Sequence, residues 1–307
     1  MRDTFVKVLL EEAKKDPSII LMTGDLGYGV LDTFEKELPG QFINSGVNEQ
    51  AMMGMAAGYA STGKRVFVYS IANFPTLRCL EQIRNDVCLM DNPVVVVSVG
   101  AGYSYGSQGY THHALEDIAV LRALANMQVI VPADPLETRE LTLAIIASKE
   151  PTYLRLGKSK EPAIHTAALK ISAGRINEVS GGDDGTLVFA GSVGTVAVAA
   201  AKELAAAGKR VAVASMPYVS TIDIDYLQKA LAKGPIIVIE EHSYRGGVGS
   251  AVLEALNAAN LHGAIGLIAA DQNNLSQIGD QSFLRHANGV SVENIVRRFI
   301  ALAADQR

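Results

Sequence analysis

Four consecutive valines, Val94 to Val97, constrain the fold of this chain more than any other feature of its sequence. A run without polar residues at alternate positions is typical of a strand covered on both faces. Similar apolar runs recur at residues 18–23, 65–69, 129–131 and 152–156. Amphipathic stretches with helical periodicity separate them, at residues 48–61, 77–90 and 136–148. Strands and helices that alternate at this spacing predict a parallel sheet with helices packed on it.

The alternation breaks between residues 157 and 185, which are richer in Lys, Ser, Gly and Asp. We expect a linker there, with an entry strand near Ile171. Further strands are expected at residues 186–190, 210–214, 236–239 and 265–268, and helices at 193–207, 248–259 and 292–303. The sequence therefore predicts an α/β protein with two consecutive parallel-sheet domains, at residues 1–165 and 186–307, joined by a linker at 166–185.

Composition excludes several classes of protein. The chain has 307 residues, of which 49% are hydrophobic and 19% charged, so a large core is expected. A net charge of −5 argues against nucleic-acid binding. No apolar run reaches the roughly 18 residues of a membrane span, and the N-terminus lacks the features of a signal peptide. Cys79 and Cys88 lack metal-type spacing, so we expect small core residues in a reduced, cytoplasmic protein.

An acidic residue, Glu49, stands at the start of a helix that is expected to be buried, because residues 51–60 are mostly small and apolar. An acid in the first turn of a helix can simply complement the helix dipole. A carboxylate at the mouth of a buried helix is nevertheless unfavourable unless it has a partner. Glu49 is therefore a candidate functional residue with a structural alternative.

A glycine-rich segment with two histidines follows the valine strand. Loops beyond the carboxyl ends of parallel strands are where α/β sheets bind ligands. His112 and His113 are candidates for proton transfer, and only one is expected to face a site because neighbouring side chains point apart. A surface pair is the plain alternative. A zinc site is disfavoured because no third ligand is spaced nearby.

Three other turns contain candidate residues. Phe74 follows the strand at 65–69 and could be an ordinary core aromatic. The segment Gly-Asp-Leu-Gly-Tyr-Gly at 24–29 does not match a dinucleotide-binding fingerprint. The segment Gly-Ser-Val-Gly-Thr at 191–195 could bind an anion at a helix start or could be a packing turn.

Taken in order, these segments resemble one family. The motifs at residues 25–26, 46–52, 111–117, 122–127 and 132–135 resemble the pyrimidine-binding domain of transketolases and 1-deoxyxylulose 5-phosphate synthases. Residues 215–217 and 240–250 resemble the C-terminal domain of the same family. The resemblance covers nearly the whole chain, and its specificity comes from the order and spacing of the motifs.

The resemblance implies that the cofactor is thiamine diphosphate. The family holds the diphosphate through Mg²⁺, with a Gly-Asp-Gly motif and a later Asn on another domain. This chain has no Gly-Asp-Gly, and Gly-Asp-Asp-Gly at 182–185 has no Asn at the family's distance. Met1 stands where the pyrimidine domain would begin. We therefore expect no metal ligand in this chain and a separate N-terminal subunit that holds Mg²⁺, in an α₂β₂ heterotetramer.

The resemblance also assigns roles to single residues. Glu49 would hydrogen-bond N1′ of the aminopyrimidine, so that the cofactor's own amino group can remove the C2 proton. Phe74 would stack on the aminopyrimidine ring. Asp25 and Leu26 would line the cofactor site. His112 aligns with a catalytic histidine that hydrogen-bonds substrate hydroxyls and helps to move protons.

Departures from the family pattern bear on the substrate. His113 stands where the family often has Gln, and Gln108 where transketolases often have an acid that binds the acceptor's C2 hydroxyl. Lys158 replaces a phosphate-binding arginine, and Arg2 is matched to a second one. A lysine binds an anion as a point charge without the bidentate fork. We expect transfer of a two-carbon ketol unit from a ketose or ketose phosphate to an aldose, with a sulfonated or branched sugar left open.

Three alternatives remain at this point. The beta subunit of a 2-oxo acid dehydrogenase shares the domain plan, the acid and the need for a partner. Half of a 1-deoxyxylulose 5-phosphate synthase-like enzyme is the second, and a non-catalytic scaffold subunit is the third. Thr-His-His at 111–113 and the pair Glu116 and Asp117 favour a transketolase. The presence of Glu49, Phe74 and His112 together argues against a scaffold.

Overall fold

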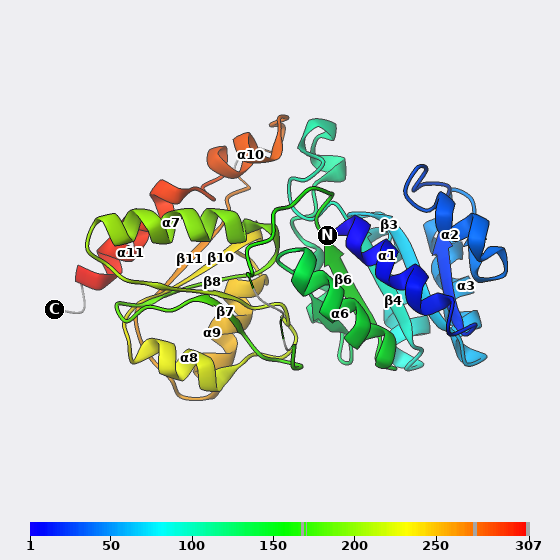
Figure 1. Cartoon of the computed structure of the whole chain (residues 1–307), viewed down its shortest axis with the longest axis horizontal. Helices are drawn as coiled ribbons and strands as arrows, with labels where there is room; N and C mark the ends of the chain where they lie inside the picture. The colour runs from blue at the N-terminus through cyan, green and yellow to red at the C-terminus, as the bar shows by residue number, and fades with distance from the viewer. Residues whose placement is uncertain (167–168, 170, 273–274, 305–307) are drawn as a thin grey trace.

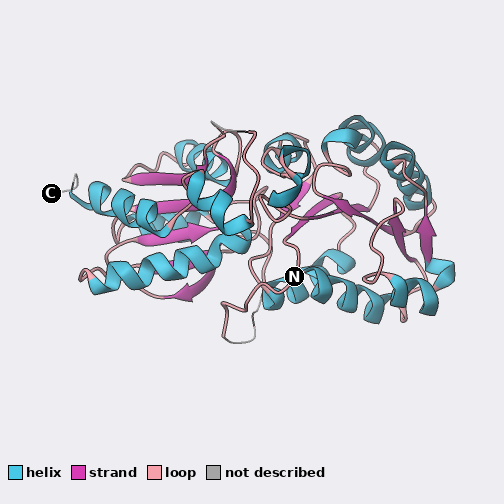
Figure 2. Ribbon diagram, turned by 90° about the horizontal axis from the view of Figure 1, so that it is seen from above, coloured by secondary structure: helices cyan, strands magenta, loops and turns pink. Residues whose placement is uncertain are grey.

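Two sheets lie side by side along the long axis of the molecule, and helices cover both faces of each (Figures 1 and 2). This computed structural model describes residues 1–166, 169, 171–272 and 275–304. The α/β class and the two consecutive sheets predicted from the alternation of strands and helices are confirmed. The linker does not separate the two sheets widely, because residues of both domains pack directly against each other.

The first sheet is entirely parallel, and its strand order is β2-β1-β3-β4-β6-β5. Its strands are β1 (Ile19–Thr23), β2 (Phe42–Asn44), β3 (Arg65–Ile71), β4 (Val94–Val99), β5 (Gln128–Ile130) and β6 (Thr152–Leu156). The valine run forms β4, which lies between β3 and β6. Val94 and Val97 are both 0% exposed, as expected of a strand with helices on both faces.

Helices and short turns complete the first domain. The α-helices are α1 (Arg2–Ala13), α2 (Asp32–Glu37), α3 (Glu49–Ser61), α4 (Leu80–Gln82), α5 (Asp117–Arg122) and α6 (Pro135–Ala147). The 3₁₀ turns are η1 (Pro39–Gln41), η2 (Leu77–Cys79), η4 (Gly106–Gln108) and η5 (Tyr110–His112), and η3 (Ile83–Leu89) is a π-helix. The helical stretch predicted at 77–90 is present, but it is not one regular α-helix. This stretch is divided among η2, α4 and η3, and π-helical turns are often found at functional sites.

The second sheet has the strand order β11-β10-β8-β9-β7. Its strands are β7 (Asn177–Ser180), β8 (Thr186–Phe189), β9 (Ala212–Ser215), β10 (Ile236–Ser243) and β11 (Ile265–Ala270). Its helices are η6 (Gly191–Val193), α7 (Gly194–Ala206), α8 (Ile224–Leu231), α9 (Val248–Ala258), α10 (Gln281–Ala287) and α11 (Val292–Ala304). β7 alone runs antiparallel, at the edge next to β9.

The entry strand expected near Ile171 is wrong. Ile171 packs against the hydrophobic core on the first sheet, and the strand that enters the second sheet is β7. The side chains of β7 alternate between half-buried and exposed, so its sequence lacks the apolar run that marks the central strands. The domain bounds 1–165 and 186–307 stay a prediction. β6 ends at Leu156 and β7 begins at Asn177.

A buried polar cluster fastens the linker to the first domain. Asp134 caps the N-terminus of α6 by accepting a hydrogen bond of 2.8 Å from the Glu137 amide. Its other oxygen accepts bonds of 2.9 Å from the amides of Ile164 and His165 and lies 3.0 Å from Nδ1 of His165. Glu137 in turn accepts hydrogen bonds from Asn177 and Ser215 of the second domain. One acidic cluster therefore connects α6, the linker and the second sheet.

This cluster predicts a loss of stability in acid. Burial alone would raise the pKa of Asp134, but four hydrogen bonds to its carboxylate outweigh burial and lower the pKa to about 2. The carboxylate therefore stabilises the native state at pH values above about 4, and this contribution of about 2 kcal/mol is lost as the pH falls toward 2. Urea unfolding at several pH values should show that Asp134→Asn flattens this decline. An unchanged decline in the variant would contradict the assignment.

Apolar side chains are exposed on α3 and on the neighbouring π-helix. Met55 and Tyr59 of α3 are 39% and 43% exposed, while Leu89 and Met90 at the end of η3 are 77% and 67% exposed. The two helices pack against each other. We call these four residues the α3 face. Exposed apolar patches of this kind mark interaction sites. Within the described ranges, no helix has both the length and the apolar character needed to cross a bilayer.

Candidate active site

Glu49 lies at the first position of α3, where Asn48 caps the helix by accepting a hydrogen bond from the Ala51 amide. The Glu49 side chain is only 4% exposed. Its Oε2 atom accepts a hydrogen bond of 2.7 Å from Nη1 of Arg78. Among the described residues, nothing donates a hydrogen bond to Oε1. The partner that a buried carboxylate requires is therefore an arginine that the sequence motifs did not single out.

Phe74 lies between Arg78 and His112. The Arg78 guanidinium carbon is 4.6 Å from the centroid of the Phe74 ring, a cation–π contact. The rings of Phe74 and His112 are 5.2 Å apart and meet edge to face at 68°. Phe74 is half-buried rather than fully enclosed in the core. The contacts thus run without a break from Glu49 through Arg78 and Phe74 to His112.

The two histidines point in different directions. Nδ1 of His112 is 3.0 Å from the Thr111 hydroxyl oxygen, and its ring lies beside Phe74. His113 is 3% exposed and packs on Tyr103 with a ring separation of 5.1 Å. Burial lowers the pKa of His113. His112 is therefore the one that adjoins Phe74, whereas His113 fills the interior of its own loop.

Two of the predicted anion-binding residues lie beside one tyrosine. Nζ of Lys158 is 5.0 Å from the ring centroid of Tyr105. Burial raises the pKa of the Tyr105 phenol, and the nearby positive charge of Arg2 opposes that rise. Tyr105 packs directly on Gly100, where a Cβ atom would be 2.3 Å from its ring. The ring of Tyr105 also lies 6.5 Å from that of His112, so it lies between the histidine and Lys158, whereas Arg2 donates a hydrogen bond of 2.8 Å to Asp3.

Three other predicted residues lie at the border of this site. Asp25 is exposed and accepts hydrogen bonds of 2.5 Å from the Tyr28 hydroxyl and 3.2 Å from Nδ2 of Asn44. Its neighbour Leu26 is half-buried and packs against the core of the first sheet. The loop that carries them approaches Glu49 at Gly24. Gln108 is exposed in η4.

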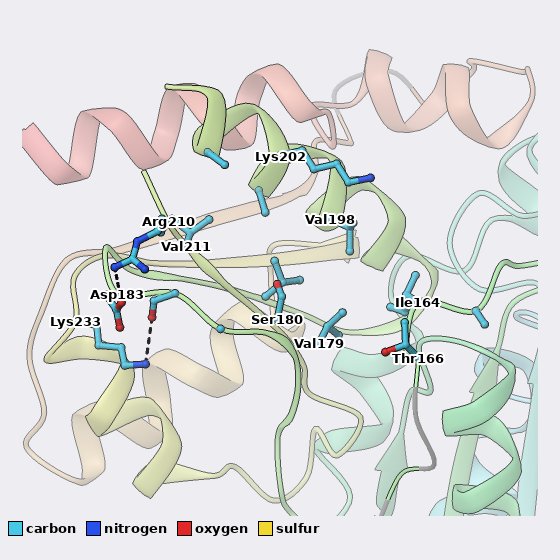
Figure 3. A pocket seen from close by; sticks show the side chains of 16 residues that line it. Ile164, Thr166, Val179, Ser180, Asp183, Val198, Lys202, Arg210, Val211 and Lys233 are labelled. Carbon is cyan, nitrogen blue, oxygen red and sulfur yellow. Dashed lines mark hydrogen bonds and ion pairs between the residues drawn. The ribbon is translucent and has the colours of Figure 1, made fainter. Parts of the chain in front are cut away.

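A separate groove of about 830 Å³ lies on the second domain, between α7 and the strands β7 and β9 (Figure 3). Val179, Val198 and Val211 contribute to its apolar floor. At its rim, Arg210 forms an ion pair of 2.8 Å with Asp183, and Lys233 donates a hydrogen bond of 3.1 Å to the carbonyl of Gly182. The Gly-Asp-Asp-Gly segment contributes Gly182 and Asp183 to the lining of this groove. The groove contains none of the predicted site residues.

Comparison with known families decides the identity of the fold. A family model described as the transketolase pyrimidine binding domain matches residues 1–162, and one described as the transketolase C-terminal domain matches residues 174–292. The chain belongs to the transketolase family. Both halves of the resemblance inferred from the motifs are thereby confirmed.

Relatives of this transketolase chain include separate subunits. It is 37% identical over 259 residues to an apulose-4-phosphate transketolase subunit of Phocaeicola vulgatus, covering 83% of each chain. It is 30% identical to the 6-deoxy-6-sulfo-D-fructose transketolase subunit SqwH of a Clostridium species, covering 97% of this chain and 92% of that one. A solved structure of a split gene transketolase, described as an inactive beta4 tetramer, has a TM-score of 0.90 at 31% identity and covers 100% of this chain and 99% of that one.

These relatives align with the transketolase chain over most of both lengths, so it is a C-terminal subunit of a split transketolase, a transferase that needs a partner. The alternatives of a 2-oxo acid dehydrogenase beta subunit and a synthase half are not favoured. Family membership also implies dependence on thiamine diphosphate.

Proposed function

We propose that this chain supplies the aminopyrimidine side of the active site in an enzyme that transfers a two-carbon ketol unit from a ketose to an aldose. The observation that carries the proposal is the continuous line of contacts from Glu49 to His112. It places an acid, a flat apolar ring and an imidazole next to one another at the carboxyl end of a parallel sheet, where such sheets bind ligands.

The residues present suit thiamine diphosphate. Glu49 is buried, one carboxylate oxygen is held by Arg78, and Oε1 accepts no hydrogen bond from the described part of the chain. This oxygen would face N1′ of the aminopyrimidine and hold the proton there. Phe74 offers a half-exposed ring on which the aminopyrimidine would stack. Asp25 and Leu26 would border the same ring. When bound, thiamine diphosphate supplies the nucleophilic carbon and the electron sink for cleavage of the ketose.

His112 would hydrogen-bond substrate hydroxyls and move protons, because its ring adjoins Phe74 on the open side of the loop. His113 is enclosed by the loop, so we assign it to shaping the substrate site rather than to chemistry. Gln108 is exposed on the same loop and would meet the acceptor. The neutral amide of Gln108 would hydrogen-bond hydroxyl groups of the acceptor without adding negative charge to the site.

The substrate would carry an anionic end. Lys158 lies over the ring of Tyr105, next to the histidine, and the positive charge of Arg2 acts on the same phenol. A cavity of about 260 Å³ adjoins Lys158 and is also lined by Lys160 and Arg285. The names of the two relatives specify a sugar phosphate and a sulfo sugar, and each of these two sugars carries a strong anion. We propose a ketose phosphate or ketose sulfonate as the donor.

Mg²⁺ and the diphosphate would be held by an N-terminal subunit. The sequence has no Gly-Asp-Gly motif, and in the described ranges no group of acids, histidines or cysteines is arranged to hold a metal. The α3 face is the surface on which that subunit would dock, since its side chains are apolar and exposed and α3 itself begins at Glu49. We propose an α₂β₂ heterotetramer. Both cysteines are buried and unpaired, which supports a reduced, cytoplasmic location.

The test is reconstitution. The chain is co-expressed with a thiamine-diphosphate-binding N-terminal transketolase subunit, and release of glyceraldehyde 3-phosphate from xylulose 5-phosphate is assayed with thiamine diphosphate, Mg²⁺ and ribose 5-phosphate. Release that requires both chains supports the proposal, and a sulfonated ketose is assayed in parallel. A complex that binds the cofactor and turns over neither class of ketose would contradict ketol transfer.

The anionic end of the substrate gives a further prediction. Lys158→Met should raise KM for a phosphorylated ketose about 10- to 100-fold, because charge-assisted hydrogen bonds to an anion are worth about 1.5–3 kcal/mol. KM for a neutral ketose should stay within about twofold. Lys229→Met, which removes an exposed charge from α8, is the matched control. Equal effects on charged and neutral donors would show that Lys158 does not bind the anion.

A further inference from the structure

The loop that carries both histidines, residues 100–116, is closed at its base. Gly102 and Ala114 form an isolated antiparallel bridge, with amide-to-carbonyl distances of 3.1 and 2.9 Å. The two residues just inside and just outside this bridge are Tyr103 and Leu115. Both are buried. The conformation of the loop, and with it the place of His112, therefore depends on what holds this base.

The second domain holds the base of this loop through hydrogen bonds with the end of β10. β10 ends in four buried polar residues, and Glu241 among them is 3% exposed. Oε1 of Glu241 accepts a hydrogen bond of 2.6 Å from the Tyr103 amide. On the other arm of the loop, the Ser243 amide donates a hydrogen bond of 2.9 Å to the Leu115 carbonyl. The C-terminal end of β10 is therefore hydrogen-bonded to both arms of the loop.

The Glu241 carboxylate is itself fixed from a third direction. Nε of Arg285, on α10, donates a hydrogen bond of 2.6 Å to Oε2, and Nη2 of the same guanidinium also contacts Oε2. Nε2 of Gln281, at the start of α10, is 3.0 Å from both oxygens. Figure 1 shows α10 beside the loop that follows β4. These contacts with two guanidinium nitrogens and one side-chain amide fix the orientation of the Glu241 carboxylate.

The loop packs tightly against the second domain at two glycines. Gly102 has a φ of +59°, and a Cβ atom there would lie 2.4 Å from Cγ of Glu241. At Gly106, a Cβ atom would lie 2.5 Å from the carbonyl oxygen of Gly279, in the segment that precedes α10. Glycine is needed where another group approaches the backbone this closely. The loop is therefore shaped to the second domain at two places.

We propose that Glu241 is a positioning residue, through which the C-terminal domain sets the conformation of the His112 loop. It touches neither the cofactor nor the reacting atoms. Its carboxylate fixes the Tyr103 amide, and the bridge passes that constraint to η5, where His112 lies. This gives the C-terminal domain a direct part in substrate binding, and in that respect the inference rests on the proposed function.

The test uses Glu241→Gln, which keeps the shape but removes the charge. A single amide oxygen cannot serve both the Tyr103 amide and Arg285. Amide hydrogen exchange of residues 100–116 in the full-length chain should rise about tenfold, as local opening of the loop becomes easier. Glu254→Gln is the matched control, because it also removes an ion pair between the domains, with Arg122, but at an exposed position far along α9. Its exchange in 100–116 should match the wild type.

The reconstituted complex gives a second readout. Glu241→Gln should raise KM for the donor ketose about tenfold and leave the Kd of thiamine diphosphate within about twofold, because Glu49 and Phe74 are not on this loop. Gln281→Ala, which spares the carboxylate, should produce a smaller rise. Unchanged exchange in 100–116, or a Kd that worsens together with KM, would overturn the proposal. Absence of turnover in the wild-type complex would count against the proposed function alone, since the exchange measurement does not depend on it.

Discussion

Glu49→Gln should lower kcat of the reconstituted enzyme by at least about 100-fold, which is the usual size of the loss when a general acid–base group is removed. Glutamine has nearly the same shape, and its amide can still accept the hydrogen bond from Arg78. It cannot hold and return a proton at N1′ of the aminopyrimidine. The measurement is kcat at saturating donor and cofactor, with circular dichroism to show that the fold is retained.

Glu203→Gln, at an exposed position on α7, is the control for loss of an acid elsewhere. Its kcat should equal that of the wild type. If Glu49→Gln kept more than about a tenth of wild-type kcat with cofactor bound, the assignment of Glu49 would be wrong. A loss of cofactor binding alone would show as a raised Kd with kcat restored at high cofactor concentration.

The second large effect concerns stability. Asp117, at the start of α5, is 0% exposed and forms a salt bridge of 2.6 Å with Nε of Arg155, which is also buried. The hydroxyl of Tyr153 also donates a hydrogen bond to this carboxylate. Burial alone would raise the pKa of Asp117, but the guanidinium of Arg155 keeps it below its usual value. Burial lowers the pKa of the neighbouring His242 to about 4, so that histidine adds no positive charge at neutral pH.

Asp117→Asn should therefore lower the free energy of unfolding by about 3–5 kcal/mol, because it leaves the Arg155 charge buried without a counter-charge. Urea unfolding at pH 7 measures the change. Asp225→Asn is the control, since Asp225 is 72% exposed and its pair with Arg175 lies at the surface. That variant should change stability by less than about 1 kcal/mol. A similar small change for Asp117→Asn would show that water reaches the pair.

Periodicity was sufficient to predict the architecture. The central strands β3, β4, β8 and β10 each contain a short apolar run, and such runs can be recognised without any tertiary information. β7 was missed because an edge strand needs only one apolar face, and its pairing with β9 is antiparallel. The division of the stretch from Leu77 to Leu89 was missed because the amphipathic pattern does not distinguish an α-helix from a π-helix.

Part of the candidate site could be proposed from the sequence, and the residues that sequence reasoning missed have a common character. Glu49, Phe74 and His112 stand within motifs, so their sequence context singles them out. Arg78 and Tyr105 act through contacts with residues far away in the sequence, and no local pattern marks them. Glu241 belonged to a motif that was assigned only to the C-terminal domain. Its contact with Tyr103 joins residues 138 positions apart, which becomes visible only in the folded chain.

The exposed apolar side chains of α3 have a consequence for gene dosage. The helix that begins with Glu49 also bears Met55 and Tyr59 on its open side, so the acid and the uncovered surface are parts of one rigid element. If the partner docks on this surface, as proposed above, copies of this chain made in excess of the partner leave it uncovered. In such copies Glu49 stands outside a complete active site. Balanced synthesis of the two subunits, rather than abundance of either, would then set the flux through the reaction.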